Sequence, residues 1–113
     1  MKVLTAYIFL IAGISFGIIA NGYFLKISDG FTKFLPSIIG IFIILLAYFS
    51  LAKAMQSIPI GFSYATYGGL TTIGVTLLGL FRFNQMPNFY ALIGIIFILI
   101  GVVVVNYFGN LNN

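Results

Sequence analysis

The chemistry open to this chain rests on hydroxyl, phenol and amide side chains. Its 113 residues include one acidic side chain and five basic ones, with neither histidine nor cysteine. The single carboxylate, Asp29, lies between Lys26 and Lys33 in a short polar stretch. Acid–base catalysis, thiol chemistry and metal binding depend on the residue types that are missing. The composition therefore predicts a protein that is not an enzyme and holds no metal and no cofactor.

The remaining polar side chains are concentrated in residues 58–81. Tyr64, Tyr67 and Thr71 follow one another at i, i+3 and i+7, which places them on one face of a helix. Phenol rings attract cations, and hydroxyls bond polar groups. The stripe therefore predicts the wall of a binding site. In the alternative interpretation, the hydroxyls bond to their own helix and the tyrosines only pack.

Gly68 and Gly69 lie beside this stripe in the middle of the same segment. Paired glycines lower helix propensity and are a common place for bends. We therefore predict a bend at Gly68-Gly69, in the segment that carries the polar stripe.

A second set of candidate residues lies in the first apolar segment, where Ser15, Ile18 and Asn21 share a helix face. A buried amide needs a hydrogen-bond partner. We therefore expect Asn21 to point into a helix bundle or an aqueous cavity. The small residues Gly13 and Gly17 in the same segment predict a close approach to another helix.

The apolar content requires a membrane to accommodate it. Hydrophobic residues make up 62% of the chain, charged residues 5%, and the mean hydropathy is +1.21. The charges leave apolar intervals of the size that a membrane-crossing helix needs, about 20 residues. These intervals predict an all-α integral membrane protein, a single four-helix transmembrane domain over residues 1–113. The helices are expected at about residues 3–25, 36–53, 58–81 and 89–108.

The basic residues are assigned to helix ends and lipid headgroups, because the net charge of +4 is too dispersed to indicate nucleic acid. Lys2 and Lys53 fall on one side of the bilayer, and Lys26, Lys33 and Arg82 on the other. Two against three is a weak bias under the positive-inside rule. Insertion in one orientation and insertion in both therefore remain open.

The fourth apolar segment carries Gly94 and Gly101 seven residues apart on one face. Small residues at this spacing indicate a contact between helices in lipid. We predict a dimer interface there that also includes Phe97 and Ile98.

Three stretches carry a family pattern: Lys26-Ile-Ser-Asp-Gly-Phe-Thr-Lys-Phe-Leu-Pro-Ser37, Ile58-Pro-Ile-Gly-Phe-Ser-Tyr-Ala-Thr-Tyr-Gly-Gly69, and Gly94 through Gly101-Val102. Together they resemble the small multidrug resistance family of the drug/metabolite transporter superfamily, without a gap from the first helix to the fourth. The resemblance implies an antiparallel dual-topology dimer whose fourth helices hold the copies together. Members exchange protons for lipophilic or guanidinium-type cations across the bacterial inner (plasma) membrane.

Carried over by position, the resemblance makes Tyr64 the chamber tyrosine and Tyr67 the aromatic residue that faces the substrate. It also puts Ile18 where the family carries its helix-1 glutamate. A phenol titrates only near pH 10, about three units above neutrality, so the tyrosines are poor substitutes for that carboxylate. The substrate-facing residues are expected to be Tyr64, Tyr67, Ser15, Ile18, Asn21 and Thr71.

Three functions remain open from the sequence. The chain transports a hydrophobic cation, either with a second copy or with a homologous sister subunit that supplies the glutamate. Alternatively, it translocates a lipid-like substrate without coupling to protons. In a different class, it is a structural or regulatory membrane protein that transports nothing.

Overall fold

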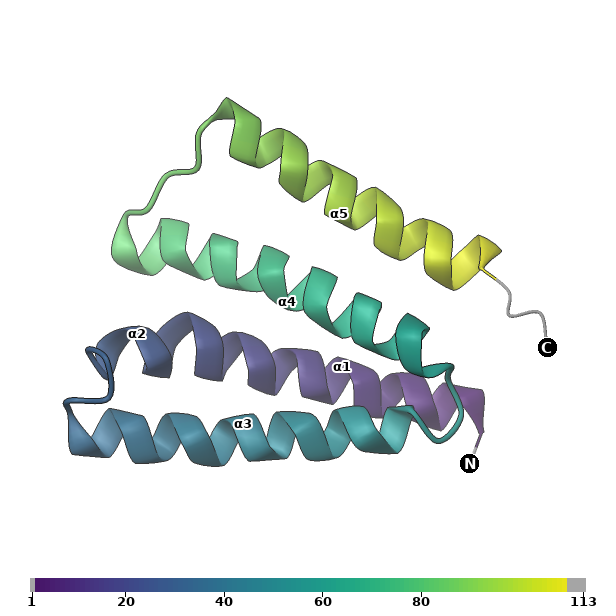
Figure 1. The fold of residues 1–113 in the computed structure, drawn as a ribbon, viewed down its shortest axis with the longest axis horizontal. Helices are drawn as coiled ribbons and strands as arrows, with labels where there is room; N and C mark the ends of the chain where they lie inside the picture. The colour runs from purple at the N-terminus through teal and green to yellow at the C-terminus, as the bar shows by residue number, and fades with distance from the viewer. Residues whose placement is uncertain (1, 110–113) are drawn as a thin grey trace.

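The computed structural model describes residues 2–109, which fold into helices without a strand. Figure 1 shows α1 and α3 side by side, α4 against them, and α5 outermost beyond α4. The predicted all-α class with four helices is confirmed. The elements in chain order are α1 (Val3–Ile19), the π-helix η1 (Ala20–Phe24), α2 (Leu25–Ile27), α3 (Phe34–Ala54), α4 (Ile60–Phe83) and α5 (Phe89–Phe108).

Proline and asparagine residues set most of the helix ends. Pro59 is the N-cap of α4, and the side chain of Asn88 caps α5 by accepting from the backbone N–H of Ala91 at 2.8 Å. Asn84 ends α4 in the left-handed conformation with φ 54°, which asparagine tolerates better than most residues. α3 begins at Phe34, two residues before Pro36. Proline fits there because first-turn N–H groups have no partner within the helix.

The first helix departs from the uninterrupted α-helix that its sequence predicts. Between Ala20 and Phe24 the winding widens to a π-helix, and the N–H of Leu25 bonds to the carbonyl of Ala20, five residues earlier. Helical structure then continues to Ile27. Apolar spacing gives no sign of this change, because a π-segment alters the register of a helix and not its hydrophobicity.

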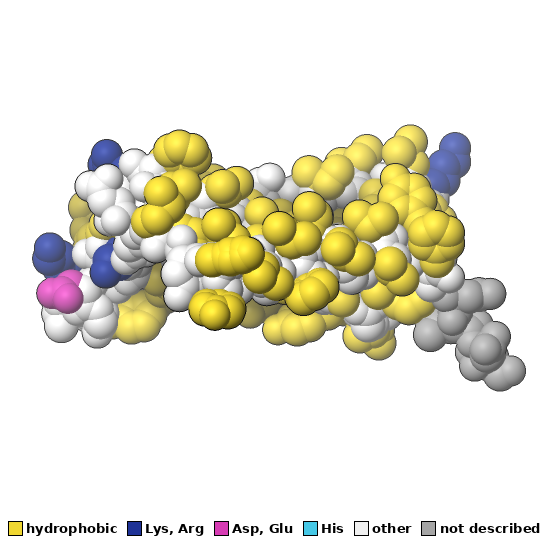
Figure 2. Space-filling model, turned by 90° about the horizontal axis from the view of Figure 1, so that it is seen from above, with side chains coloured by type: hydrophobic (Ala, Val, Ile, Leu, Met, Phe, Trp, Pro, Cys, Tyr) yellow, Lys and Arg dark blue, Asp and Glu magenta, His cyan; other side chains and the backbone are white. Residues whose placement is uncertain are grey.

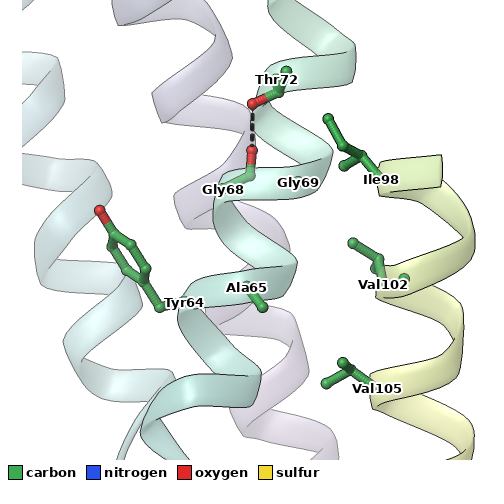
Figure 3. Close-up of a pocket in the computed structure, with 9 residues that line it drawn as sticks. Tyr64, Ala65, Gly68, Gly69, Thr72, Ile98, Val102 and Val105 are labelled. Carbon is green, nitrogen blue, oxygen red and sulfur yellow. Dashed lines mark hydrogen bonds between the residues drawn. The ribbon is translucent and has the colours of Figure 1, made fainter. Parts of the chain in front are cut away.

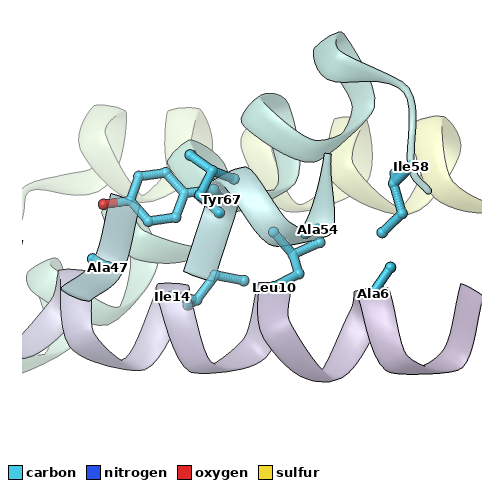
Figure 4. Packing of buried hydrophobic residues seen from close by; sticks show 8 residues of the cluster. Ala6, Leu10, Ile14, Ala47, Ala54, Ile58 and Tyr67 are labelled. Atoms are coloured by element: carbon cyan, nitrogen blue, oxygen red, sulfur yellow. The ribbon is translucent and has the colours of Figure 1, made fainter. Parts of the chain in front are cut away.

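The buried core lies between α1, α3 and the start of α4, as Figure 4 shows. Helix packing in lipid depends on van der Waals contact and on small residues that let backbones approach. Gly13 illustrates this, because a Cβ atom there would lie 3.0 Å from the carbonyl oxygen of Ala47 on α3. The core cluster consists of Ala6, Leu10, Ile14, Ala47, Leu51, Ala54, Ile58 and Tyr67.

Three helical stretches in the described part of the chain are long and apolar enough to cross a membrane: Val3–Ile27, Phe34–Ala54 and Phe89–Phe108. α4 has sufficient length, 24 residues, but its hydroxyl side chains lower its hydropathy. On the face that Figure 2 shows, basic and acidic side chains lie at the two ends of the molecule and hydrophobic ones between them. This is the distribution that a bilayer requires.

Candidate functional site

Three tyrosines from two helices form an aromatic cluster, named here the tyrosine triad: Tyr48 on α3, and Tyr64 and Tyr67 on α4. Tyr67 is central, with its ring centroid 6.0 Å from that of Tyr48 and 6.2 Å from that of Tyr64. Tyr67 is buried, whereas its two neighbours are exposed. Aromatic faces attract cations, so two exposed rings supported by a buried third can receive a cationic group.

Tyr48 was not among the residues predicted from the sequence. The second apolar segment is dominated by Ile, Leu and Phe, a composition that indicates lipid contact and packing. The available signal was Tyr48 itself, the one phenol in that segment. Its proximity to Tyr67 depends on how α3 packs against α4, which helix periodicity within a single segment does not reveal.

α1 and α4 approach closely on the side of the triad. A Cβ atom at Gly17 would lie 2.8 Å from Tyr67 Oη, so the absence of a side chain makes room for the phenol. One residue later, the partly buried Ile18 packs against Gly74, where a Cβ atom would overlap Ile18 Cδ1. A larger residue on either glycine would force the two helices apart.

Asn21 lies in η1, partly buried, one helical turn beyond Ile18. Its side-chain Nδ2 donates a hydrogen bond of 2.9 Å to the carbonyl oxygen of Gly17. The bond to its own helix orients the amide and leaves the Oδ1 atom without a donor among the described residues. The sequence predicted that Asn21 would point into a helix bundle or an aqueous cavity, and the structure places it among the residues that line a cavity.

That cavity, named here the Asn21 cavity, has a volume of about 330 Å³ and lies between η1 and α4. Thr71, on its wall, is 8% exposed, and its Oγ1 is the one buried side-chain oxygen or nitrogen in residues 2–109 with no hydrogen-bond partner. Its lining residues include a phenol, an amide and several hydroxyls, although apolar atoms form most of the cavity surface. The lining residues are Asn21, Tyr67, Gly68, Thr71, Thr72, Val75 and Thr76.

Of the six residues expected to face the substrate, the structure brings Tyr67, Asn21 and Thr71 together around the Asn21 cavity. Ser15 lies elsewhere, exposed on α1, where its hydroxyl donates to the carbonyl of Ile11 at 3.0 Å. Ile18 is engaged with Gly74 and is not part of the cavity lining.

Tyr64, the sixth, lines a groove of about 470 Å³ between α4 and α5. In Figure 3 the glycine face of α4 lies opposite Ile98, Val102 and Val105 of α5, and the Thr72 hydroxyl bonds to the Gly68 carbonyl at 2.7 Å. A Cβ atom at Gly69 would lie 2.6 Å from Val102 Cγ2. α4 runs as an α-helix through Gly68 and Gly69, and Gly69 contacts α5; the bend at these glycines stays a prediction.

α5 presents most of its surface outwards, and within Phe89–Phe108 only Val102 is buried. Gly94 and Gly101 face open space, with no atom within 4 Å of a Cβ at either position. Phe97 is also exposed, whereas Ile98 contacts Gly69 of its own chain. The four residues predicted for a dimer interface thus lie on a largely uncovered helix, and the dimer itself stays a prediction.

One polar network holds α5 to the remainder of the chain. The Tyr7 hydroxyl on α1 donates to Asn106 Oδ1 at 2.9 Å, and Asn106 Nδ2 donates to Thr66 Oγ1 on α4 at 2.7 Å and to the Val102 carbonyl at 2.8 Å. Sequence reasoning had assigned Asn106 no role. An amide near the end of an otherwise apolar helix is the signal that would have identified it.

The single carboxylate, Asp29, lies outside the helices in an exposed loop at φ 52°. No helix of the chain contains an acidic residue. The helical part of the site is therefore uncharged, and its electrostatics come from aromatic rings and from oriented hydroxyl and amide dipoles.

The model of the Small Multidrug Resistance protein family matches residues 5–105. The chain belongs to the small multidrug resistance family. It is 38% identical to the quaternary ammonium compound-resistance protein QacC of Staphylococcus aureus over 103 residues, 91% of this chain and 95% of that protein. It is also 38% identical to the multidrug resistance protein EbrA of Bacillus subtilis (strain 168) over 104 residues, 92% of this chain and 98% of EbrA.

The quaternary ammonium compound-resistance protein QacF of Klebsiella aerogenes is 37% identical over 100 residues, 88% of this chain and 90% of that protein. Membership in the small multidrug resistance family makes this chain a multi-pass membrane transporter of the bacterial plasma membrane, and not an enzyme. The resemblance found in the sequence is confirmed.

Proposed function

We propose that the chain is a subunit of a small multidrug resistance transporter that moves lipophilic cations of the quaternary ammonium or guanidinium type across the plasma membrane. The observation that carries the proposal is the tyrosine triad beside the Asn21 cavity, whose lining contains no basic residue. A desolvated cation over a tyrosine ring gains about 2 kcal/mol. Two relatives are named for resistance to quaternary ammonium compounds, which supports the same substrate class.

We further propose that the working unit is an antiparallel, dual-topology pair. The uncovered face of α5, with Gly94 and Gly101 open, supports an interface between two chains. The weak charge bias between the two ends of the molecule supports insertion in both orientations.

This chain lacks the residue that the family pattern uses to couple transport to protons. Ile18 replaces the helix-1 glutamate, its side chain packs on Gly74, and no helix offers another carboxylate. We therefore propose that a homologous sister chain supplies the titratable carboxylate in a heteromeric pair. The same observation favours a second candidate, uncoupled translocation of a lipid-like substrate, which needs no carboxylate.

The test places the purified protein in liposomes and follows uptake of a quaternary ammonium cation against an imposed pH gradient. We expect little gradient-driven uptake by the chain alone and clear uptake when a glutamate-bearing sister chain is added. Ile18→Glu should confer gradient-driven uptake on the chain alone, whereas the matched variant Ile18→Gln, which cannot titrate, should not.

Uptake by the wild-type chain alone, driven by the gradient, would contradict the need for a carboxylate at this position. Translocation of a fluorescent lipid at a rate independent of the gradient would favour the uncoupled alternative. Inactivity of every combination toward cations and lipids would refute transport and leave a structural or regulatory role.

A further inference from the structure

Residues that line the Asn21 cavity carry hydrogen-bonding atoms that the protein itself leaves unused. The hydroxyls of Thr72 and Thr76 donate to carbonyls of their own helix, at 2.7 Å and 2.8 Å, so only their acceptor lone pairs face outwards. The Asn21 amide donates to Gly17, which leaves Oδ1 as a free acceptor. Thr71 Oγ1 has no partner in residues 2–109.

Resting on the proposed function, we propose that Asn21 and Thr71 form a polar subsite that binds the N–H groups of a transported cation next to the tyrosine triad. Buried polar atoms without partners are uncommon in native proteins and need an explanation. A ligand that supplies the missing hydrogen bonds provides one here. The subsite distinguishes cations that carry N–H groups from quaternary ammonium ions, which carry none.

The balance of donors and acceptors determines which ligand fits. An amide Oδ1 and the hydroxyl oxygens of Thr72 and Thr76 accept hydrogen bonds, and the Thr71 hydroxyl, buried behind the lining and unpaired, is a further acceptor once the ligand's N–H groups reach it. No basic side chain lines the cavity, so a cation meets no repulsion. A guanidinium or protonated amine therefore fits this lining better than an anion or an acceptor-only molecule.

The local structure gives the subsite its geometry. Asn21 lies in the π-helical turn Ala20–Phe24, and its side chain is fixed by the bond to Gly17. π-helical turns are frequent at functional sites because they redirect individual side chains. Thr71 lies one turn beyond Tyr67 on α4, so one ligand can place its charged group over the phenol ring and its N–H groups on Asn21 and Thr71.

The experiment compares two cations with the same aromatic tail and charge, benzylguanidinium and benzyltrimethylammonium. Binding to the protein in detergent is measured by calorimetry for the wild type, Asn21→Ala and Thr71→Val. Each variant is expected to weaken benzylguanidinium binding about tenfold, the usual effect of losing a hydrogen bond to a charged group. Benzyltrimethylammonium binding is expected to stay within about twofold, because this ion makes no such bond.

Thr5→Val is the matched control, since Thr5 is exposed on α1, away from the cavity, and carries the same change of hydroxyl to methyl. Circular dichroism checks that each variant stays folded. If Asn21→Ala disturbs η1, Thr71→Val still tests the subsite, because valine has nearly the same shape as threonine. Equal weakening of both cations, or of neither, would overturn the subsite and leave the proposed function intact. Failure of the wild type to bind either cation, both alone and paired with the glutamate-bearing sister chain, would overturn both.

Discussion

The contact between Ile18 and Gly74 offers a quantitative test of how α1 and α4 are held together. A Cβ atom at Gly74 would overlap Ile18 Cδ1 and lie 2.5 Å from Cγ1 and 3.3 Å from Cγ2. Ordinary carbon–carbon contacts are about 3.5–4.0 Å. Gly74→Ala therefore requires Ile18 to move by about 1 Å or the two helices to separate.

The expected cost of Gly74→Ala is that of overpacking, about 1–3 kcal/mol of unfolding free energy. Ile18→Ala alone should cost about 1–2 kcal/mol. This is less than in a soluble core, because lipid is as apolar as the side chain and only packing is lost. In the double variant the new methyl group enters the space that Ile18 vacates. The total should then fall short of the sum of the single variants by about 1–3 kcal/mol.

The assay is equilibrium unfolding in mixed detergent micelles, followed by circular dichroism at one protein concentration. Gly61→Ala is the matched control, because Gly61 is also in α4 and a Cβ there meets no atom within 4 Å. We expect this control to be neutral or slightly stabilising, since alanine favours helix by about 1 kcal/mol. A Gly74→Ala variant as stable as the control, or strictly additive effects in the double variant, would refute the packing described here.

Asn106→Ala should lower the free energy of unfolding by about 1–2 kcal/mol, because two hydrogen bonds between helices are lost and the Tyr7 hydroxyl is left unpaired. A double-mutant cycle with Tyr7→Phe measures the coupling between the two residues, and a coupling energy of zero would contradict this prediction. Gly69→Ala should weaken the packing of α5 against α4, since its Cβ would lie 2.6 Å from Val102. Amide hydrogen exchange in α5 should then be faster. Unchanged exchange would show that the two helices accommodate the methyl group without loss of packing. Tyr48→Leu should weaken binding of a quaternary ammonium cation by about 0.5–1 kcal/mol in calorimetry, whereas unchanged affinity would remove this residue from the tyrosine triad's function.

Helix periodicity in the sequence was enough to select several of the candidate site residues. The spacing of Tyr64, Tyr67 and Thr71 identified the polar face of the third segment, and the single amide of the first segment singled out Asn21. Such grouping is possible within one helix because 3.6 residues per turn determine which side chains share a face. It does not extend across helices, which is why Tyr48, on another helix, was missed.

The first helix does not keep a single register along its length. Ser15 was expected beside Asn21, yet it is exposed while Asn21 lines a cavity. Between them the helix changes from α to π winding at Ala20. A change of winding shifts the angular position of every later residue, and nothing in the apolar pattern records it.

The sequence by itself determined the class of the protein, because composition and charge positions act without reference to tertiary contacts. An apolar chain with charges at the ends of its segments has to cross a bilayer as helices, since helical hydrogen bonding satisfies the backbone there. The lack of a carboxylate in any helix is equally a property of the sequence.

Tertiary structure alone decided which small and polar residues meet. Gly17 admits the Tyr67 phenol, Gly74 receives Ile18, and Thr71 is left buried without a hydrogen-bond partner among residues 2–109. The physical reason is that lipid supplies no hydrophobic drive between helices, so packing of particular surfaces selects the arrangement. That selection depends on shapes contributed by several segments at once, and no single segment encodes it.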